Sequence, residues 1–142
     1  MAHAIFVDEA KKRSLNIDIY SAGILDFSDQ PPLDETSRTC LHFNTPPPKL
    51  TPTWVAQLPI DSIDQFLVME QHHAEALENQ FKISPDRIAL LGSFDPKRRG
   101  EEIPDPFFSY SEEVYRSSYE LIRDCIIEYL DKNRGGRSPL VN

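Results

Sequence analysis

The spacing between apolar residues changes several times along the chain, and each change marks the boundary of a predicted helix or strand. Residues 1–15 place apolar side chains at i, i+3 and i+4, with three basic residues in the last turns, and this pattern predicts a helix that ends at Asn16. Residues 17–22 alternate instead with the period of two that is typical of a short strand, which Gly23 ends.

Prolines mark the boundaries of the next segments. Pro31-Pro32 opens a second predicted helix, which has two acidic residues in its first turn and runs to about Phe43. A loop with three consecutive prolines follows, and residues 53–58 then show a weaker helical pattern.

Two short apolar runs lie in the second half of the chain. Phe66–Met69 and Ile88–Leu91 are typical of strands that are buried on both faces of a parallel sheet. His72–Phe81, between them, has a helical pattern. The longest helical pattern is Ser111–Lys132, which has an apolar stripe on one side and two glutamates in its first turn.

Strands that alternate with helices indicate an α/β fold with a parallel sheet. Only three strands can be identified, however, and the chain opens on a helix where such folds usually place a strand. The length of 142 residues favours a single domain. We therefore expect one domain over residues 1–133 with a strand missing at its front, followed by a flexible, polar and Gly-rich tail over residues 134–142.

Charge and composition exclude several classes of partner. Lys and Arg number 15 against 23 Asp and Glu, and the net charge of −8 disfavours nucleic-acid binding. No apolar run is as long as a membrane span, and no signal-peptide pattern opens the chain, so no membrane partner is expected. The two cysteines lie far apart in the sequence, which favours a reducing cytoplasm.

Two pairs of residues, two histidines and two cysteines, could bind a metal or act as nucleophiles, but their positions in the sequence do not favour either role. His72 and His73 could bind a metal, but adjacent helical positions point about 100° apart, and no further cluster supports them. No metal site is expected. Cys125 lies on the apolar stripe of the last helix and Cys40 in a predicted helix, so both thiols are expected to be buried and unreactive.

Asp105 is the strongest candidate for chemistry. It lies between Pro104 and Pro106, which hold its backbone extended, and it precedes Phe107 and Phe108. Aromatic rings lower the local dielectric and favour the protonated form of an acid, as a general acid requires. The alternative is a rigid surface loop whose aspartate begins the next helix.

Several short motifs occur in an order that resembles the low-molecular-weight protein tyrosine phosphatase family over about Met1 to Leu130. They are a helix that begins Met-Ala-x-Ala, then Ser21-Ala22-Gly23, Asp26-Phe27, Phe66-Leu67-Val68-Met69, Leu90-Leu91-Gly92 and Asp105-Pro106-Phe107-Phe108. The resemblance implies a small doubly wound domain with a four-stranded parallel sheet in the order 2-1-3-4. It also implies hydrolysis of phosphotyrosine or related phosphomonoesters through a cysteinyl-phosphate, without a cofactor or a metal.

The resemblance also implies roles for individual residues. Asp105 matches the general acid that protonates the leaving phenolate. Phe27 matches an aromatic residue that lines the substrate cleft. Phe107 and Phe108 stand where many members have two tyrosines, and would keep the apolar wall of the site.

The family signature Cys-x5-Arg-Ser-Pro, which supplies the nucleophile and the phosphate loop, should directly precede Met-Ala-x-Ala, and no Cys-x5-Arg occurs in the chain. Cys40 is followed six positions later by Pro46, and Cys125 by Asp131. By resemblance, the missing first strand is the central one. We therefore expect the chain to be inactive as it stands, and its sheet to be poorly stable with two unpaired edges.

Three functions remain open at this point. The first is a phosphatase whose nucleophile and phosphate loop lie upstream of Met1. The second is a non-catalytic, pseudophosphatase-like binding or regulatory protein. The third is an arsenate reductase-like relative on the same scaffold.

Overall fold

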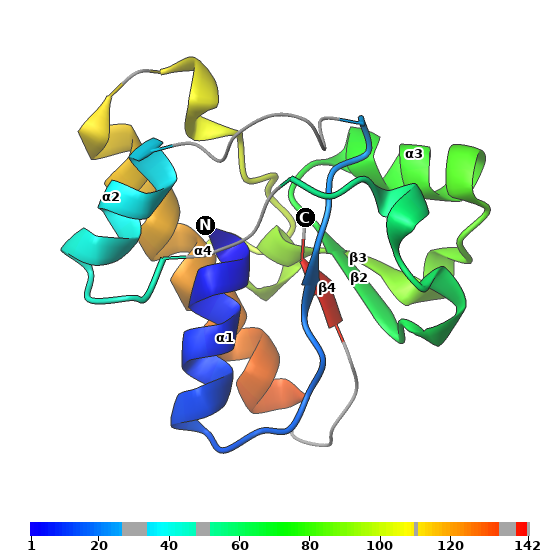
Figure 1. Cartoon of the computed structure of the whole chain (residues 1–142), viewed down its shortest axis with the longest axis horizontal. Helices are drawn as coiled ribbons and strands as arrows, with labels where there is room; N and C mark the ends of the chain where they lie inside the picture. The colour runs from blue at the N-terminus through cyan, green and yellow to red at the C-terminus, as the bar shows by residue number, and fades with distance from the viewer. Residues whose placement is uncertain (27–33, 48–51, 110, 134–138, 142) are drawn as a thin grey trace.

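The core of the computed structural model is a parallel β-sheet with helices on both faces (Figure 1). The structure describes residues 1–26, 34–47, 52–109, 111–133 and 139–141. Within these residues the sheet has four strands in the order β1-β4-β2-β3, and every pair is parallel. The strands are β1 (Tyr20–Ser21), β2 (Gln65–Val68), β3 (Ile88–Leu90) and β4 (Pro139–Val141).

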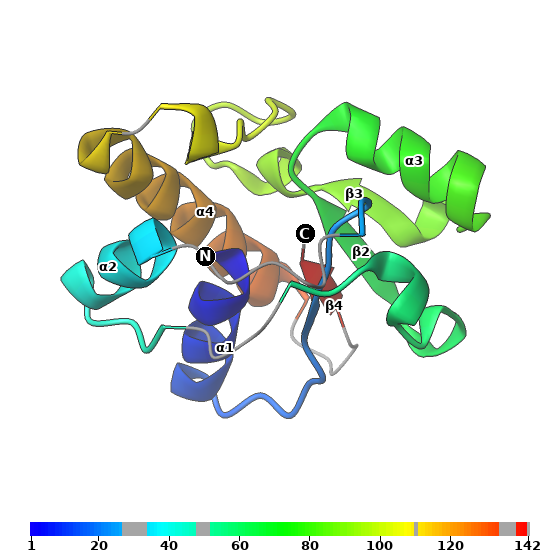
Figure 2. The ribbon, with the colours of Figure 1, turned by 45° about the horizontal axis from the view of Figure 1, so that its top comes forward.

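Four α-helices cover the two faces of this sheet. They are α1 (Ala2–Lys12), α2 (Asp34–His42), α3 (Gln71–Phe81) and α4 (Glu112–Lys132). Helix α4 packs against α1 and α2 on one side, and α3 lies across β2 and β3 on the other (Figure 2). Five 3-10 turns complete the described structure: Val55–Gln57, Ile60–Ser62, Pro85–Arg87, Leu91–Phe94 and Pro106–Phe108.

Strand β2 explains why the fold needs helices on both faces. Its side chains alternate between two hydrophobic clusters, as successive residues of a strand must. Leu67 packs into the cluster formed mainly by α1 and α4, whereas Phe66 and Val68 pack into the cluster that contains residues of α3. All three side chains are fully buried, so this short apolar run is a two-faced parallel strand as its composition predicted.

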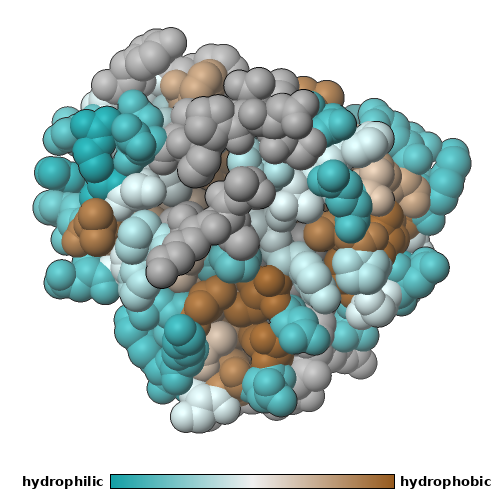
Figure 3. All heavy atoms as spheres, viewed as in Figure 1, coloured by the Kyte–Doolittle hydropathy of each residue, from teal (hydrophilic) through white to brown (hydrophobic). Residues whose placement is uncertain are grey.

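Figure 3 shows one face of the molecule, with hydrophilic side chains over α2 and apolar surface confined to separate areas of that face. Among the described residues, no helix combines the length and the apolar character needed to cross a bilayer.

Most elements lie where the periodicity predicted them, with small shifts at their ends. Helix α1 ends near Ser14, whose φ of 53° is the left-handed conformation that stops a helix. The strand predicted over residues 17–22 is shorter than expected and comprises β1 alone. The weak helical pattern near residues 53–58 forms the single 3-10 turn Val55–Gln57.

The centre of the sheet corrects the expectation of a missing strand. Pro139–Val141 forms β4 between β1 and β2, with Leu140 opposite both Tyr20 and Phe66. Strand β4 therefore pairs with the facing edges of both β1 and β2. The described sheet does not have the two unpaired edges from which instability was predicted. Of the segment expected to be a flexible tail, residues 134–142, the structure describes only this strand. Sequence pattern missed it because three residues are too few to show a period.

Candidate functional site

A cavity of about 280 Å³ opens where β1 and β2 end. Ser21 is the last residue of β1, Met69 follows β2, and both line the cavity. The first turn of α1 and the loop that carries Asp105 form other parts of its wall. Ligands of open parallel sheets bind at the carboxyl ends of the strands, so this cavity has the position expected of a binding site.

Asp105 reaches the cavity from a loop that its two prolines hold extended. Its backbone has φ −70° and ψ 121°, and one carboxylate oxygen, Oδ1, accepts a hydrogen bond of 2.9 Å from the backbone N–H of Phe107. Asp105 thus begins the 3-10 turn Pro106–Phe108 and also lines the cavity. The structural interpretation of the sequence, in which Asp105 begins the next helical segment, holds for this 3-10 turn, whereas the general-acid role stays a prediction. The carboxyl group of Asp105 is exposed rather than desolvated.

Two hydrogen bonds hold the loop that carries Asp105 to the segment between β2 and α3. The N–H of Ile103 donates to the carbonyl oxygen of Met69 at 2.9 Å, and the N–H of Gln71 donates to Glu102 Oε1 at 2.6 Å. Ile103 is buried beneath the cavity, so apolar packing adds to these bonds. The chain just before Asp105 is therefore anchored to the segment between β2 and α3 by hydrogen bonds and by apolar packing.

Gly92, in the 3-10 turn Leu91–Phe94 that follows β3, permits a close approach by the same loop. A Cβ atom at this position would lie 1.7 Å from the carbonyl oxygen of Glu101, a distance that no side chain can occupy. The carbonyl oxygen of Gly92 also accepts hydrogen bonds from the N–H groups of Asp95 and Gly100, at 3.1 and 3.0 Å. A glycine is required here because two backbone segments are in contact.

The three aromatic residues named from the sequence lie differently. Phe107 is 43% exposed on the turn after Asp105. Phe108 belongs to the same turn, but its side chain is outside the described structure, as is the whole of Phe27. The apolar wall and the cleft-lining role expected of them remain predictions.

Sequence reasoning did not identify several residues that line the cavity. Tyr115 comes from α4 and Thr36 from α2, and His3 and His73 come from the first turns of α1 and α3. Burial lowers the pKa of His3, although its Nε2 lies 3.2 Å from the carbonyl oxygen of Ile19. Tyr115 occupied a core position of the helical pattern, and no local signal distinguishes a core tyrosine from one at a cavity wall.

Neither cysteine reaches the cavity. Cys40 and Cys125 are both fully buried, as predicted, and both are free thiols. Burial raises the pKa of Cys40. Burial, followed by the negative charges of Asp95 and Asp124, raises the pKa of Cys125 to about 12. Since the thiolate is the nucleophile, neither group is suited to covalent catalysis in this structure.

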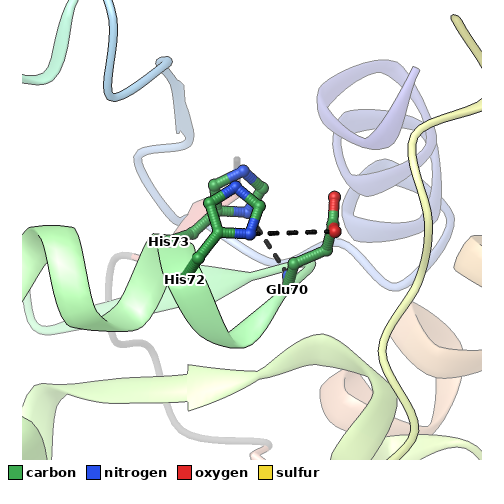
Figure 4. A group of neighbouring side chains, drawn as sticks. All are labelled: Glu70, His72 and His73. Carbon is green, nitrogen blue, oxygen red and sulfur yellow. Dashed lines mark hydrogen bonds and ion pairs between the residues drawn. The ribbon is translucent and has the colours of Figure 1, made fainter.

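Among the residues that the structure describes, one group of side chains could bind a metal ion. Glu70, His72 and His73 lie at the start of α3, and one ligand atom from each falls within 4.8 Å of the others (Figure 4). His73 also lines the cavity.

Several solved structures that are described as phosphatases superpose closely on this chain. A mutant of YwlE from Bacillus subtilis superposes with a TM-score of 0.83 at 18% identity, over 94% of this chain and 88% of that one. The low molecular weight phosphotyrosine phosphatase VcLMWPTP-2 from Vibrio cholerae O395 has a TM-score of 0.80 at 24% identity, over 94% and 88%. The enzyme from T. tengcongensis has a TM-score of 0.82 at 20% identity, over 92% and 88%.

At these identities the structural likeness establishes the fold. The search of curated proteins returned no match. The sequence itself matches the family model described as low molecular weight phosphotyrosine protein phosphatase over residues 1–134, which is nearly the whole chain. This chain therefore belongs to the low molecular weight phosphotyrosine protein phosphatase family.

Proposed function

We propose that this domain belongs to a phosphomonoester hydrolase in which Asp105 is the general acid, and that the nucleophile and phosphate loop are not among these 142 residues. The observation that carries the proposal is the position of Asp105 in the wall of the cavity at the carboxyl ends of β1 and β2. In this proposal Asp105 donates a proton to the oxygen that leaves the phosphorus atom. The hydrogen bond from Phe107 to Oδ1 orients the carboxyl group for that transfer.

The first turn of α1 supports a phosphate group in the same cavity. Ala2 and His3 line the cavity, and this first turn contains no acidic side chain. Backbone N–H groups at the start of a helix are unpaired donors, and the helix dipole adds positive charge there. A phosphate bound at this end of α1 would lie in the same cavity as Asp105.

The proposed substrate is a phosphotyrosine-type phosphomonoester, as the family description suggests. One related structure is described as the YwlE arginine phosphatase with a phosphorylated active-site serine, so phosphoarginine is the principal competing substrate. The free thiols Cys40 and Cys125 support a further proposal that the protein works in the reducing cytoplasm.

The test begins with the DNA upstream of the Met1 codon. We expect an in-frame Cys-x5-Arg-Ser-Pro, and we expect the correspondingly longer protein to hydrolyse p-nitrophenyl phosphate. In that protein Asp105→Asn should lower kcat by about 10²–10⁴-fold, the usual contribution of a general acid. A stop codon directly before Met1, or a longer protein whose kcat is unchanged by Asp105→Asn, would contradict the proposal.

A non-catalytic binding or regulatory protein is the second candidate. It is favoured by one observation: the cavity is formed without any Cys-x5-Arg in the chain, and both cysteines are buried elsewhere. Such a protein would bind a phosphorylated partner without converting it. Phosphotyrosine binding by this chain, together with a stop codon before Met1, would select this candidate.

A further inference from the structure

Two imidazole rings and one carboxylate converge at the start of α3. The ring centroids of His72 and His73 lie 4.1 Å apart, and His72 Nδ1 is 3.8 Å from Glu70 Oε2 (Figure 4). His73 Nδ1 accepts a hydrogen bond of 3.3 Å from the backbone N–H of Glu70. Both rings are thus directed toward the same residue.

Helical spacing alone does not predict this convergence. Glu70 is the N-cap of α3 and its backbone is extended, with φ −131° and ψ 154°. His73, three residues later, folds back over the helix end to cap it, and His72 turns toward the Glu70 carboxylate. The 100° between adjacent positions describes where Cα–Cβ bonds point. In the first turn, the attraction of both side chains to Glu70 overcomes that divergence.

We propose that Glu70, His72 and His73 bind one Zn²⁺ ion at the rim of the cavity. Two imidazole nitrogens and one carboxylate oxygen form a common three-ligand set for zinc, which leaves a fourth position for water or another ligand. Zinc ligands lie about 2.0–2.2 Å from the ion, so the three ligand atoms must move closer together than they now lie. The His72 side chain is 61% exposed and can rotate to make this adjustment.

The capping hydrogen bond of His73 is the interaction that metal binding would replace. At 3.3 Å it lies beyond the usual range for an N–H donor, so little stabilisation is lost when a metal–nitrogen bond forms.

Charge at the rim also favours a dication. The carboxylates of Glu70, Asp105 and Glu102 all act on His73, and the chain as a whole has a net charge of −8. Glu102 accepts the hydrogen bond from the N–H of Gln71 and so links the start of α3 to the loop that carries Asp105. A bound ion would restrain the α3 side of this junction, because all three proposed ligands lie there. The inference does not depend on phosphatase activity.

The test is calorimetric titration of the untagged 142-residue protein with Zn²⁺. We expect saturable binding of one ion, weakened at least about 10-fold by His72→Gln and by Glu70→Gln. The matched control is His42→Gln, the same change at another exposed histidine, on α2, which should leave the affinity unchanged. Circular dichroism confirms that each variant is folded.

Co²⁺ provides a second readout that does not depend on the variants. Its absorption spectrum should show nitrogen and oxygen coordination without the charge-transfer band that thiolate ligands produce, since Cys40 and Cys125 are buried. Absence of saturable Zn²⁺ binding would overturn the proposal. So would equal affinity in His72→Gln and His42→Gln, or a thiolate band with Co²⁺.

Discussion

The Asp105 loop and the helical core present opposite chemical environments. Asp105 is exposed at a cavity, at the end of the sheet where ligands bind. Cys125 has no exposed surface and lies in the cluster between α1 and α4, and Cys40 is equally buried on α2. The chain therefore exposes a carboxylic acid at the cavity and buries both of its thiols away from it. Neither Cys40 nor Cys125 is placed to act as the nucleophile of the proposed phosphatase.

The largest expected effect concerns the reactivity of these thiols. A pKa raised from 9.0 to about 12 lowers the thiolate fraction of Cys125 at pH 8 by about 10³-fold, and burial blocks access as well. We expect iodoacetamide to label Cys125 of the folded protein at least about 10³-fold more slowly than that of the protein in guanidinium chloride. Mass spectrometry of timed samples measures both rates. Labelling of the folded protein at a comparable rate would remove the distinction between the two regions.

A second prediction tests whether the Asp105 loop is held by the contact at Gly92. Gly92→Ala places a methyl group against the backbone of Glu101, and we expect it to lower the free energy of unfolding by about 3 kcal/mol. Gly23→Ala is the matched control, because a Cβ there meets its nearest atom at 3.6 Å, an ordinary contact. Urea unfolding compares the two variants. Equal stabilities would show that the loop is not packed against Gly92.

The raised pKa of Cys125 predicts how stability depends on pH. The folded pKa exceeds the unfolded value of 9.0, so the stabilisation is complete below pH 9 and is lost as the pH rises toward about 12. Above pH 9 the unfolded state releases a proton that the folded state retains, which costs about 1.4 kcal/mol per pH unit. Between pH 9 and 10.5 the wild-type protein should lose about 2 kcal/mol more than Cys125→Ala. Parallel pH curves for the two proteins would contradict this.

The smallest effect is expected at the acid itself. Asp105→Asn changes an exposed side chain, and asparagine can still accept the hydrogen bond from the N–H of Phe107. The free energy of unfolding should change by less than about 0.5 kcal/mol. Thermal unfolding of the two proteins side by side checks this. A loss of several kcal/mol would mean that Asp105 serves the fold rather than the cavity.

The elements that the sequence predicts correctly are those whose apolar residues repeat with a regular local spacing. The stripe of the last helix predicted α4 within one residue of its start, and the run of apolar residues ending at Met69 predicted β2. The position of Asp105 followed from its flanking prolines and from the order of motifs. Its exposure did not, because the solvation of a loop side chain depends on how the folded chain packs around it.

Two features depended on contacts that no local pattern encodes. Strand β4 is defined by its partners Tyr20 and Phe66, which are more than 70 residues away in the sequence. The convergence of His72 and His73 is defined by the N-cap conformation of Glu70. Periodicity in the sequence indicates on which face of a helix or strand a side chain is attached. Strand β4 and the paired histidines depend instead on long-range strand pairing and on side-chain rotation.

Turnover of p-nitrophenyl phosphate by the purified 142-residue chain tests most directly whether the acid and the nucleophile are separated. We predict no hydrolysis above the buffer rate, because Asp105 has no thiolate or phosphate loop to act with in these residues, and Asp105→Asn should be equally inactive. Hydrolysis by the wild-type chain that Asp105→Asn abolishes would show that a nucleophile reaches the cavity after all, and would contradict the account.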